Sequence, residues 1–211
     1  MGEDRVAAQA GHDAYGVARV IALSDGIFAI ATTLLVLDLP IPQLLHATNA
    51  DLLNALVDLR PNFASFVLSF VLVGLNWINH HRLFRGVVRT DPRLMQLNLA
   101  QLLVVCLVPF TAALLARYGE LATAVVFYAS NLCLMGILST LMRLHLMRAG
   151  LLDPDPGPGQ LRRSLFTSLS SVAVFGASIP IAFWNPNLAE FVWLALIPLR
   201  VLLTRLPSTK E

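Results

Sequence analysis

A serine, an aspartate and two histidines stand within apolar surroundings in this chain. Ser24 and Asp25 interrupt the run 19–38, RVIALSDGIFAIATTLLVLD, and His80 and His81 close the polar stretch NWINHH. Serine, acid and histidine could form a hydrolase triad, but the glycine frame of a nucleophile elbow is missing. Adjacent histidines point about 100° apart on a helix and cannot chelate one ion as an i, i+4 pair would. We therefore predict no enzymatic activity, no metal site and no bound cofactor.

An acid within an apolar helix must be satisfied by other groups. By the most lenient scale a carboxylate there costs about 3 kcal/mol. Asn79 and His80 share one helix face with Asn76, and such residues could serve as partners. We predict a structural polar network made of Arg19, Ser24, Asp25, Asn79, His80 and Asn98. A proton relay is the alternative interpretation, because histidine titrates near neutral pH.

Helical spacing divides the segment that carries Ser24 and Asp25 into faces. One stripe, in steps of four and three, is aliphatic: Leu23, Ile27, Ile30, Leu34 and Leu37. A second stripe consists of small residues that allow close helix approach in lipid: Ala22, Gly26, Ala29 and Thr33. At 100° per residue, Asp25 lies about 140° from Ile30. The aliphatic stripe therefore faces lipid, ordinary helix packing, or an oligomer axis where Ile30, Leu34 and Leu37 would form a hydrophobic constriction.

Composition and block lengths indicate a membrane protein. Hydrophobic residues make up 56% of the 211 residues and charged residues 13%, against roughly a quarter charged in soluble proteins. Six apolar blocks approach the roughly 20 helical residues that cross a bilayer: 18–39, 63–83, 95–116, 121–143, 164–184 and 188–206. We predict an all-α membrane protein with six transmembrane helices in a single domain, 1–211, and a short external helix within 40–62.

Basic residues fall almost entirely on one side of these spans. Of the 15 lysines and arginines, only Arg60 and Arg117 lie on the opposite side. The positive-inside rule then predicts a multi-pass protein of the cytoplasmic membrane with both termini in the cytoplasm. The net charge of +2 argues against a nucleic-acid partner.

Two segments resemble the transmembrane protein 175 potassium channel family. The run R-x-x-x-L-S-D-G-I-F-A-I-A-T-T-L-L-V-L spans Arg19 to Leu37 and is similar to that family's signature of an arginine, three residues and Phe-Ser-Asp. Residues 77–110 are similar to its second and third helices in prokaryotic members. Leu23 replaces the motif phenylalanine, and Ser24 and Asp25 are intact.

The resemblance implies a homotetramer in the lipid bilayer whose first helices line a central pore. It places the narrowest ring at Ile30 and further rings at Leu34 and Leu37, and it links Thr33 to potassium preference. It also assigns Arg19, Ser24 and Asp25 to a structural network around the pore helix. We expect a potassium-selective cation channel that conducts monovalent cations passively, with potassium as the permeant ion and no cofactor. The alternative is a proton-conducting or proton-coupled transport protein.

Overall fold

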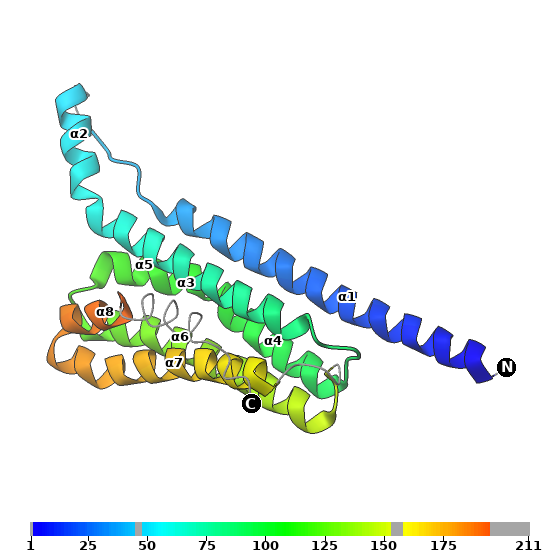
Figure 1. Ribbon diagram of the computed structural model, residues 1–211. Coiled ribbons are helices and arrows are strands. Elements are labelled where there is room, and N and C mark those ends of the chain that lie inside the picture. The colour runs from blue at the N-terminus through cyan, green and yellow to red at the C-terminus, as the bar shows by residue number, and fades with distance from the viewer. Residues whose placement is uncertain (1, 45–47, 153–157, 195–211) are drawn as a thin grey trace.

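The computed structural model describes residues 2–44, 48–152 and 158–194, and its regular elements there are all helices (Figure 1). Five stretches of the described residues are long and apolar enough to cross a membrane: 13–38, 60–84, 92–118, 122–149 and 165–184. The prediction of an all-α membrane protein is confirmed. The sixth predicted span, 188–206, begins in α8 (Pro186–Leu194), and its remainder lies outside the described residues.

The first helix is longer than its apolar part. α1 runs from Gly2 to Leu34 and continues as the 3-10 helix η1, Leu35–Asp38. The sequence prediction of 18–39 captured only the membrane part, because hydropathy does not detect a polar helical extension. At 1.5 Å per residue α1 is about 50 Å long, which exceeds the roughly 30 Å hydrocarbon core. The backbone turns extended at Leu39, as the following proline requires.

A short helix follows on the side opposite the N-terminus. α2 (Asn49–Asp58) begins at Thr48, whose side chain accepts a hydrogen bond from the Asp51 N–H at 3.2 Å. A short helix is thus present within 40–62, as predicted, and it projects away from the bundle with no residue buried (Figure 1). Its external position stays a prediction. α3 (Arg60–Phe84) then starts with a proline in its first turn, where the missing N–H costs nothing.

The third apolar block forms two helices. α4 (Pro92–Cys106) and α5 (Val108–Tyr118) meet at Leu107, although the sequence predicted one helix over 95–116. Pro109 explains the break, because it has no N–H and its ring clashes with the carbonyl four residues earlier. α6 (Ala122–Ala149) ends at Gly150, whose φ of 60° is the left-handed conformation typical of a helix C-terminus.

The last long helix packs closely along α6. α7 (Pro158–Trp184) crosses α6 at Gly136, where an added Cβ would stand 3.0 Å from Val172 Cγ2 and 3.4 Å from Ser171 Cβ. A larger residue at 136 would require Val172 to shift, and small residues at such close contacts are common in membrane helix pairs. α8 then folds back onto α7 and places Trp193 in the main core beside Tyr128.

Two separate hydrophobic cores fill the bundle. The larger contains Phe28, Val73, Leu102 and Met135, and the smaller contains Val17, Leu83, Leu94 and Met142. On each of α1, α3, α4 and α6, buried polar residues lie between the positions that belong to the two cores, and on α6 the buried Arg143 directly follows Met142 of the smaller core. We call this set the polar layer: Ser24, Asn76, Asn79, His80, Asn98, Gln101, Ser139 and Arg143. Since burying unsatisfied polar groups costs stability, the layer must supply its own hydrogen bonds.

Candidate functional site

One part of the polar layer joins α1 to α3 and α4. The Asn98 amide donates to Ser24 Oγ at 3.1 Å, and Asn98 Oδ1 lies 2.8 Å from His80 Nε2. Ser24 Oγ in turn donates to the Val20 carbonyl at 2.8 Å. This pattern is satisfied when His80 carries its proton on Nε2. The three side chains are at most 2% exposed, so they fix the rotation of α1 against its neighbours.

The other members of the layer join α3, α4, α6 and α7. The Gln101 amide donates to Asn76 Oδ1 at 3.0 Å and accepts from the Ser139 hydroxyl at 3.3 Å. Asn79 lies elsewhere than the Ser24 group, because its amide donates to Ser168 Oγ at 3.4 Å. The predicted shared face of Asn76, Asn79 and His80 therefore reaches three different sets of partners.

A buried arginine belongs to the layer and was missed by the sequence analysis. Arg143 is 4% exposed, and its Nη2 donates to Asn79 Oδ1 at 3.3 Å. Its Nε finds no hydrogen-bond partner among the residues that the structure describes. The signal in the sequence was a charge six residues before the end of an apolar helix. A charge at that position is equally typical of a side chain that anchors the helix at the membrane interface.

The predicted pore residues lie on an exposed side of α1 and η1, turned away from the Ser24 group. Ile30 is 59% exposed, Leu34 41% and Leu37 75%, and Thr33 is exposed beside them. The Thr33 hydroxyl donates to the Ile30 carbonyl at 2.9 Å. Among the described residues of the protomer these four side chains are exposed, so this face is available to lipid or to other protomers.

The small residues of α1 lie on the same open side. Ala22, Gly26 and Ala29 are exposed, and a Cβ added at Gly26 would meet nothing within 4 Å. The protomer itself therefore gives no reason for glycine at this position. A second helix could approach α1 closely along this stripe.

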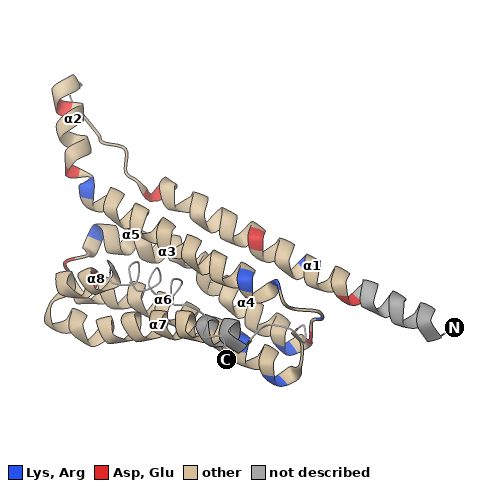
Figure 2. Cartoon of the chain, viewed as in Figure 1, with Lys and Arg blue, Asp and Glu red and all other residues tan. Residues whose placement is uncertain are grey.

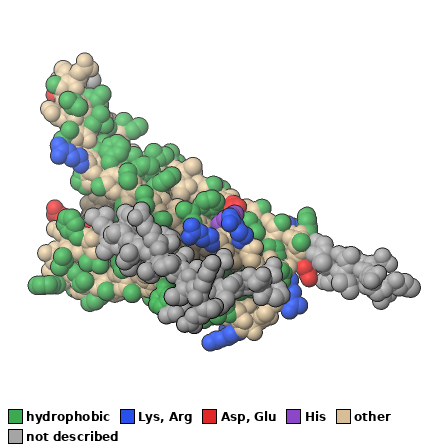
Figure 3. All heavy atoms as spheres, viewed as in Figure 1, with side chains coloured by type: hydrophobic (Ala, Val, Ile, Leu, Met, Phe, Trp, Pro, Cys, Tyr) green, Lys and Arg blue, Asp and Glu red, His purple; other side chains and the backbone are tan. Residues whose placement is uncertain are grey.

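Asp25 and Arg19 lie outside the Ser24 group. The Asp25 carboxylate accepts a hydrogen bond from the Trp77 indole at 2.8 Å, and the Arg19 guanidinium stands 5.9 Å from the Tyr15 ring centre. Trp77 also packs on His81, whose Nε2 lies 3.3 Å from Arg85 Nη2. Figure 3 shows acidic, basic and histidine side chains gathered at one place on a face that is otherwise largely hydrophobic or neutral.

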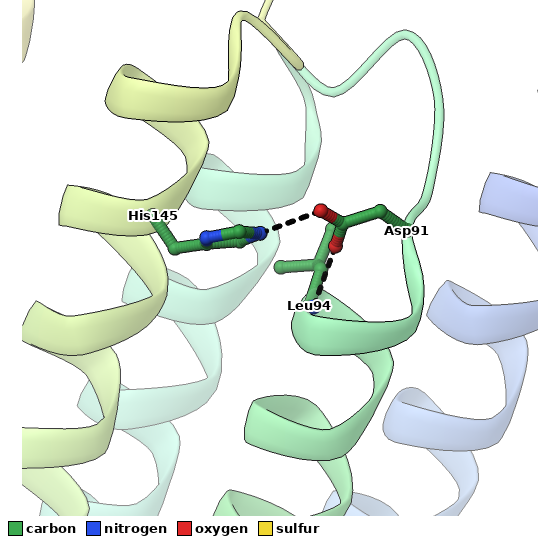
Figure 4. A network of polar contacts seen from close by, with 3 residues as sticks. All are labelled: Asp91, Leu94 and His145. Carbon is green, nitrogen blue, oxygen red and sulfur yellow. Dashed lines mark hydrogen bonds and ion pairs between the residues drawn. The ribbon is translucent and has the colours of Figure 1, made fainter.

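A third polar group joins Asp91, just before α4, to His145 near the end of α6. One Asp91 carboxylate oxygen accepts the Leu94 N–H at 2.7 Å, and the other lies 2.7 Å from His145 Nε2 on α6 (Figure 4). Burial raises the pKa of the Asp91 carboxyl, but the hydrogen bonds from Leu94 and His145 outweigh it and lower the pKa below 3.8. The dipeptide Asp91-Pro92 before an apolar run is a helix-start signal. The sequence analysis did not use it.

Metal binding has no support in the described part of the chain. No three histidine, cysteine, aspartate or glutamate side chains come together there. The two cysteines, Cys106 and Cys133, are free thiols. The arrangement of the described residues as a whole is one of anchored helices and an open apolar face on α1.

Comparisons with known proteins find similarity to ion channels. The family model described as "Endosomal/lysosomal potassium channel TMEM175" matches residues 19–109. A potassium channel from Streptomyces collinus is 41% identical over 149 residues, which is 64% of this chain and 68% of that protein. The crystal structure of a lysosomal potassium-selective channel TMEM175 homolog from Chamaesiphon minutus superposes with a TM-score of 0.76 and 28% identity, covering 90% of this chain and 98% of that one.

A vertebrate relative matches over a shorter stretch. The endosomal/lysosomal proton channel TMEM175 of Gallus gallus is 35% identical over 108 residues, which is 48% of this chain and 22% of that protein. The matched part is thus about two thirds of the Streptomyces protein, nearly all of the Chamaesiphon chain in the crystal structure, and about a fifth of the chicken protein.

Proposed function

This chain belongs to the TMEM175 channel family, and from that premise we propose that it is a potassium-selective cation channel that conducts passively. The Streptomyces relative is named a potassium channel, and the Chamaesiphon structure is described as potassium-selective. The observation that carries the proposal is the two-sided α1, which is anchored by Ser24 and leaves Ile30 exposed. A helix built in this way can hold an apolar wall in a fixed direction.

We propose that four copies assemble with their α1 helices around a common axis. Only 22% of the most apolar window of the first span is buried in the protomer, so much apolar surface remains to be covered. Rings of Ile30, Leu34 and Leu37 would then form the hydrophobic constriction, which blocks ions by dewetting until it widens. The Thr33 hydroxyl, whose proton is donated to the Ile30 carbonyl, still has an oxygen lone pair to offer a passing cation.

Assembly also accounts for Asp25. Its carboxylate is partly exposed, and in the described part of the chain it accepts a hydrogen bond from the Trp77 indole N–H. A carboxylate left facing hydrocarbon would cost at least about 3 kcal/mol. We propose that neighbouring protomers enclose Asp25 together with Arg19, so that both belong to the structural network once the tetramer forms.

The charge distribution supports one orientation in the cell membrane. Figure 2 shows that most of the Lys and Arg positions gather at the end where α3 ends, α4 begins and α6 ends. By the positive-inside rule this end faces the cytoplasm. We propose a multi-pass protein of the cytoplasmic membrane with both termini inside, and we retain the predicted sixth span within 188–206.

Flux measurements on the purified full chain in liposomes test the proposal. With a potassium gradient and an ionophore-set membrane potential, potassium efflux should exceed sodium efflux from matched vesicles. Chemical cross-linking of the same preparation should give a ladder that ends at four subunits. Equal potassium and sodium fluxes would contradict selectivity, and a ladder that ends at two would contradict the pore arrangement.

Proton conduction is the second candidate, and one observation favours it. Asp25 and His81 both contact Trp77 on α3, and the chicken relative is named a proton channel. Histidine can exchange protons near neutral pH. Acidification of liposomes measured without potassium or sodium distinguishes the two functions: a proton flux as large as the potassium flux would favour this candidate.

A further inference from the structure

An open groove of about 630 Å³ lies between α1 and the loop that follows α3. Its floor is apolar, because Val17, Phe84 and Val87 are each at most 8% exposed. Its rim is basic, because Arg85 and Arg89 line it and are exposed. The volume falls within the range of small-ligand pockets in proteins. The groove therefore combines an apolar surface with two cations at its edge.

The depth of the groove in the bilayer follows from the α1 residues that line it. These residues lie between Asp13 and Ile21, and the apolar block of the first span begins among them, at about residue 18. The groove thus stands where hydrocarbon gives way to lipid headgroups. It also lies at the basic end of the bundle, which we assign to the cytoplasmic leaflet (Figure 2).

We propose that this groove binds an anionic phospholipid of the cytoplasmic leaflet. The phosphate would lie between Arg85 and Arg89, and the first part of an acyl chain would lie along Val17 and Ile21. Guanidinium groups bind phosphate oxygens in bidentate geometry, and basic pockets between membrane helices suit anionic headgroups. The carboxylate of Asp13 at the same groove leaves a surplus of one positive charge.

The groove touches the polar layer through one aromatic ring. Phe84, part of its floor, stacks on His80 with 4.5 Å between ring centres. His80 is hydrogen-bonded to Asn98, which is hydrogen-bonded to Ser24 on α1. A bound lipid therefore bridges α1 and the end of α3 directly and supports the same helix contact that the polar layer makes.

Native mass spectrometry of the full chain in detergent tests the proposal with phosphatidylglycerol and phosphatidylcholine as probes. Phosphatidylglycerol should stay bound and phosphatidylcholine should not. Arg85→Gln/Arg89→Gln should weaken phosphatidylglycerol binding about thirtyfold, at roughly 1 kcal/mol per arginine near the surface. The matched control is Arg93→Gln/Arg148→Gln, two exposed arginines at the same end that do not line the groove. Equal losses in the two double variants would overturn the proposal.

Two further variants test the groove in other ways: Ala18→Trp leaves the overall charge unchanged, and Asp13→Asn is expected to strengthen binding rather than weaken it. Ala18→Trp places a ring in the groove from an exposed position and should abolish retention of phosphatidylglycerol with all arginines present. Asp13→Asn should strengthen retention, because it removes the acid at the groove. Full retention in Ala18→Trp would overturn the proposal. Complete displacement of phosphatidylglycerol by millimolar inorganic phosphate would also overturn it, since the site would then recognise a free anion.

Discussion

Ser24 and Ile30 lie on the same helix but face different surroundings: Ser24 is fully buried against Asn98, and Ile30 is 59% exposed. Their positions are about 120° apart at 100° per residue. Because the polar layer fixes the rotation of α1, it also fixes the direction in which Ile30 points. A change on either side of α1 should therefore have its own measurable consequence.

Ile30→Asn should increase the basal potassium flux in liposomes. A polar side chain at the proposed constriction holds water that the aliphatic ring excludes, so the barrier to ions falls. We expect an increase of at least about tenfold, which corresponds to roughly 1.4 kcal/mol of barrier. Leu103→Asn on α4, at a residue that is 65% exposed, serves as the control and should leave the flux unchanged. An unchanged flux in Ile30→Asn would sink the pore assignment.

Asn98→Leu should destabilise the protomer. The substitution leaves Ser24 Oγ and His80 Nε2 without the partner that both contact, and an unsatisfied buried group costs about 1–3 kcal/mol. The thermal unfolding midpoint in detergent should fall accordingly. Gln96→Leu, on the exposed side of the same helix, should change the midpoint little. If the two variants unfold alike, the Ser24 group does not stabilise the helix contact.

Asp25→Asn should reduce the amount of tetramer recovered in detergent. Asparagine can still accept a hydrogen bond from the Trp77 indole N–H, but it has no negative charge to strengthen that bond. Hydrogen bonds to charged groups contribute about 1.5–3 kcal/mol. Size-exclusion chromatography with light scattering measures the recovery. Glu120→Gln, an exposed carboxylate in the turn between α5 and α6, is the control. Normal assembly with altered flux would show that Asp25 acts in conduction rather than in structure.

Asp91→Asn should remove an acid-sensitive part of the stability. The folded-state pKa of Asp91 is lowered below 3.8, so the unfolded chain takes up the proton first as the pH falls. The charged contact therefore stabilises the fold above pH 3.8 and is lost as the pH falls through the lower, folded-state pKa.

The size of this effect is modest because asparagine still caps α4. We expect the free energy of unfolding of the wild type to exceed that of Asp91→Asn by about 0.2–1 kcal/mol near neutral pH. This is the range measured for exposed ion pairs. The difference in unfolding midpoint should shrink toward zero below pH 4 or so. Asp58→Asn, at an exposed residue at the end of α2, should show no such trend. If the difference grows on acidification instead, folding raises the pKa of Asp91 rather than lowering it.

Hydropathy predicted the membrane helices because burial in lipid depends on composition over about 20 residues. It could not predict the length of α1, whose polar extension has no hydropathy signal, or the break at Leu107, which depends on Pro109. Proline in a membrane helix is often tolerated without a break. The sequence alone therefore gave no reason to prefer two helices over one.

The polar layer was only partly predictable. Periodicity placed Asn76, Asn79 and His80 on one face, and this face is buried. It could not assign partners, because these depend on the vertical register of separate helices. Arg143 and Ser139 on α6 were missed for that reason, and Trp77, the partner that the protomer offers Asp25, could not be singled out from the other polar residues near it.

Cysteine chemistry at position 30 tests the central claim most directly. In a background where Cys106 and Cys133 are replaced by alanine, Ile30→Cys should place four thiols around one axis. We expect micromolar silver or cadmium ions to block the potassium flux of this variant, and an oxidant to cross-link its subunits in pairs. Leu103→Cys in the same background should show neither effect. A potassium flux through Ile30→Cys that these ions leave unchanged would contradict the account.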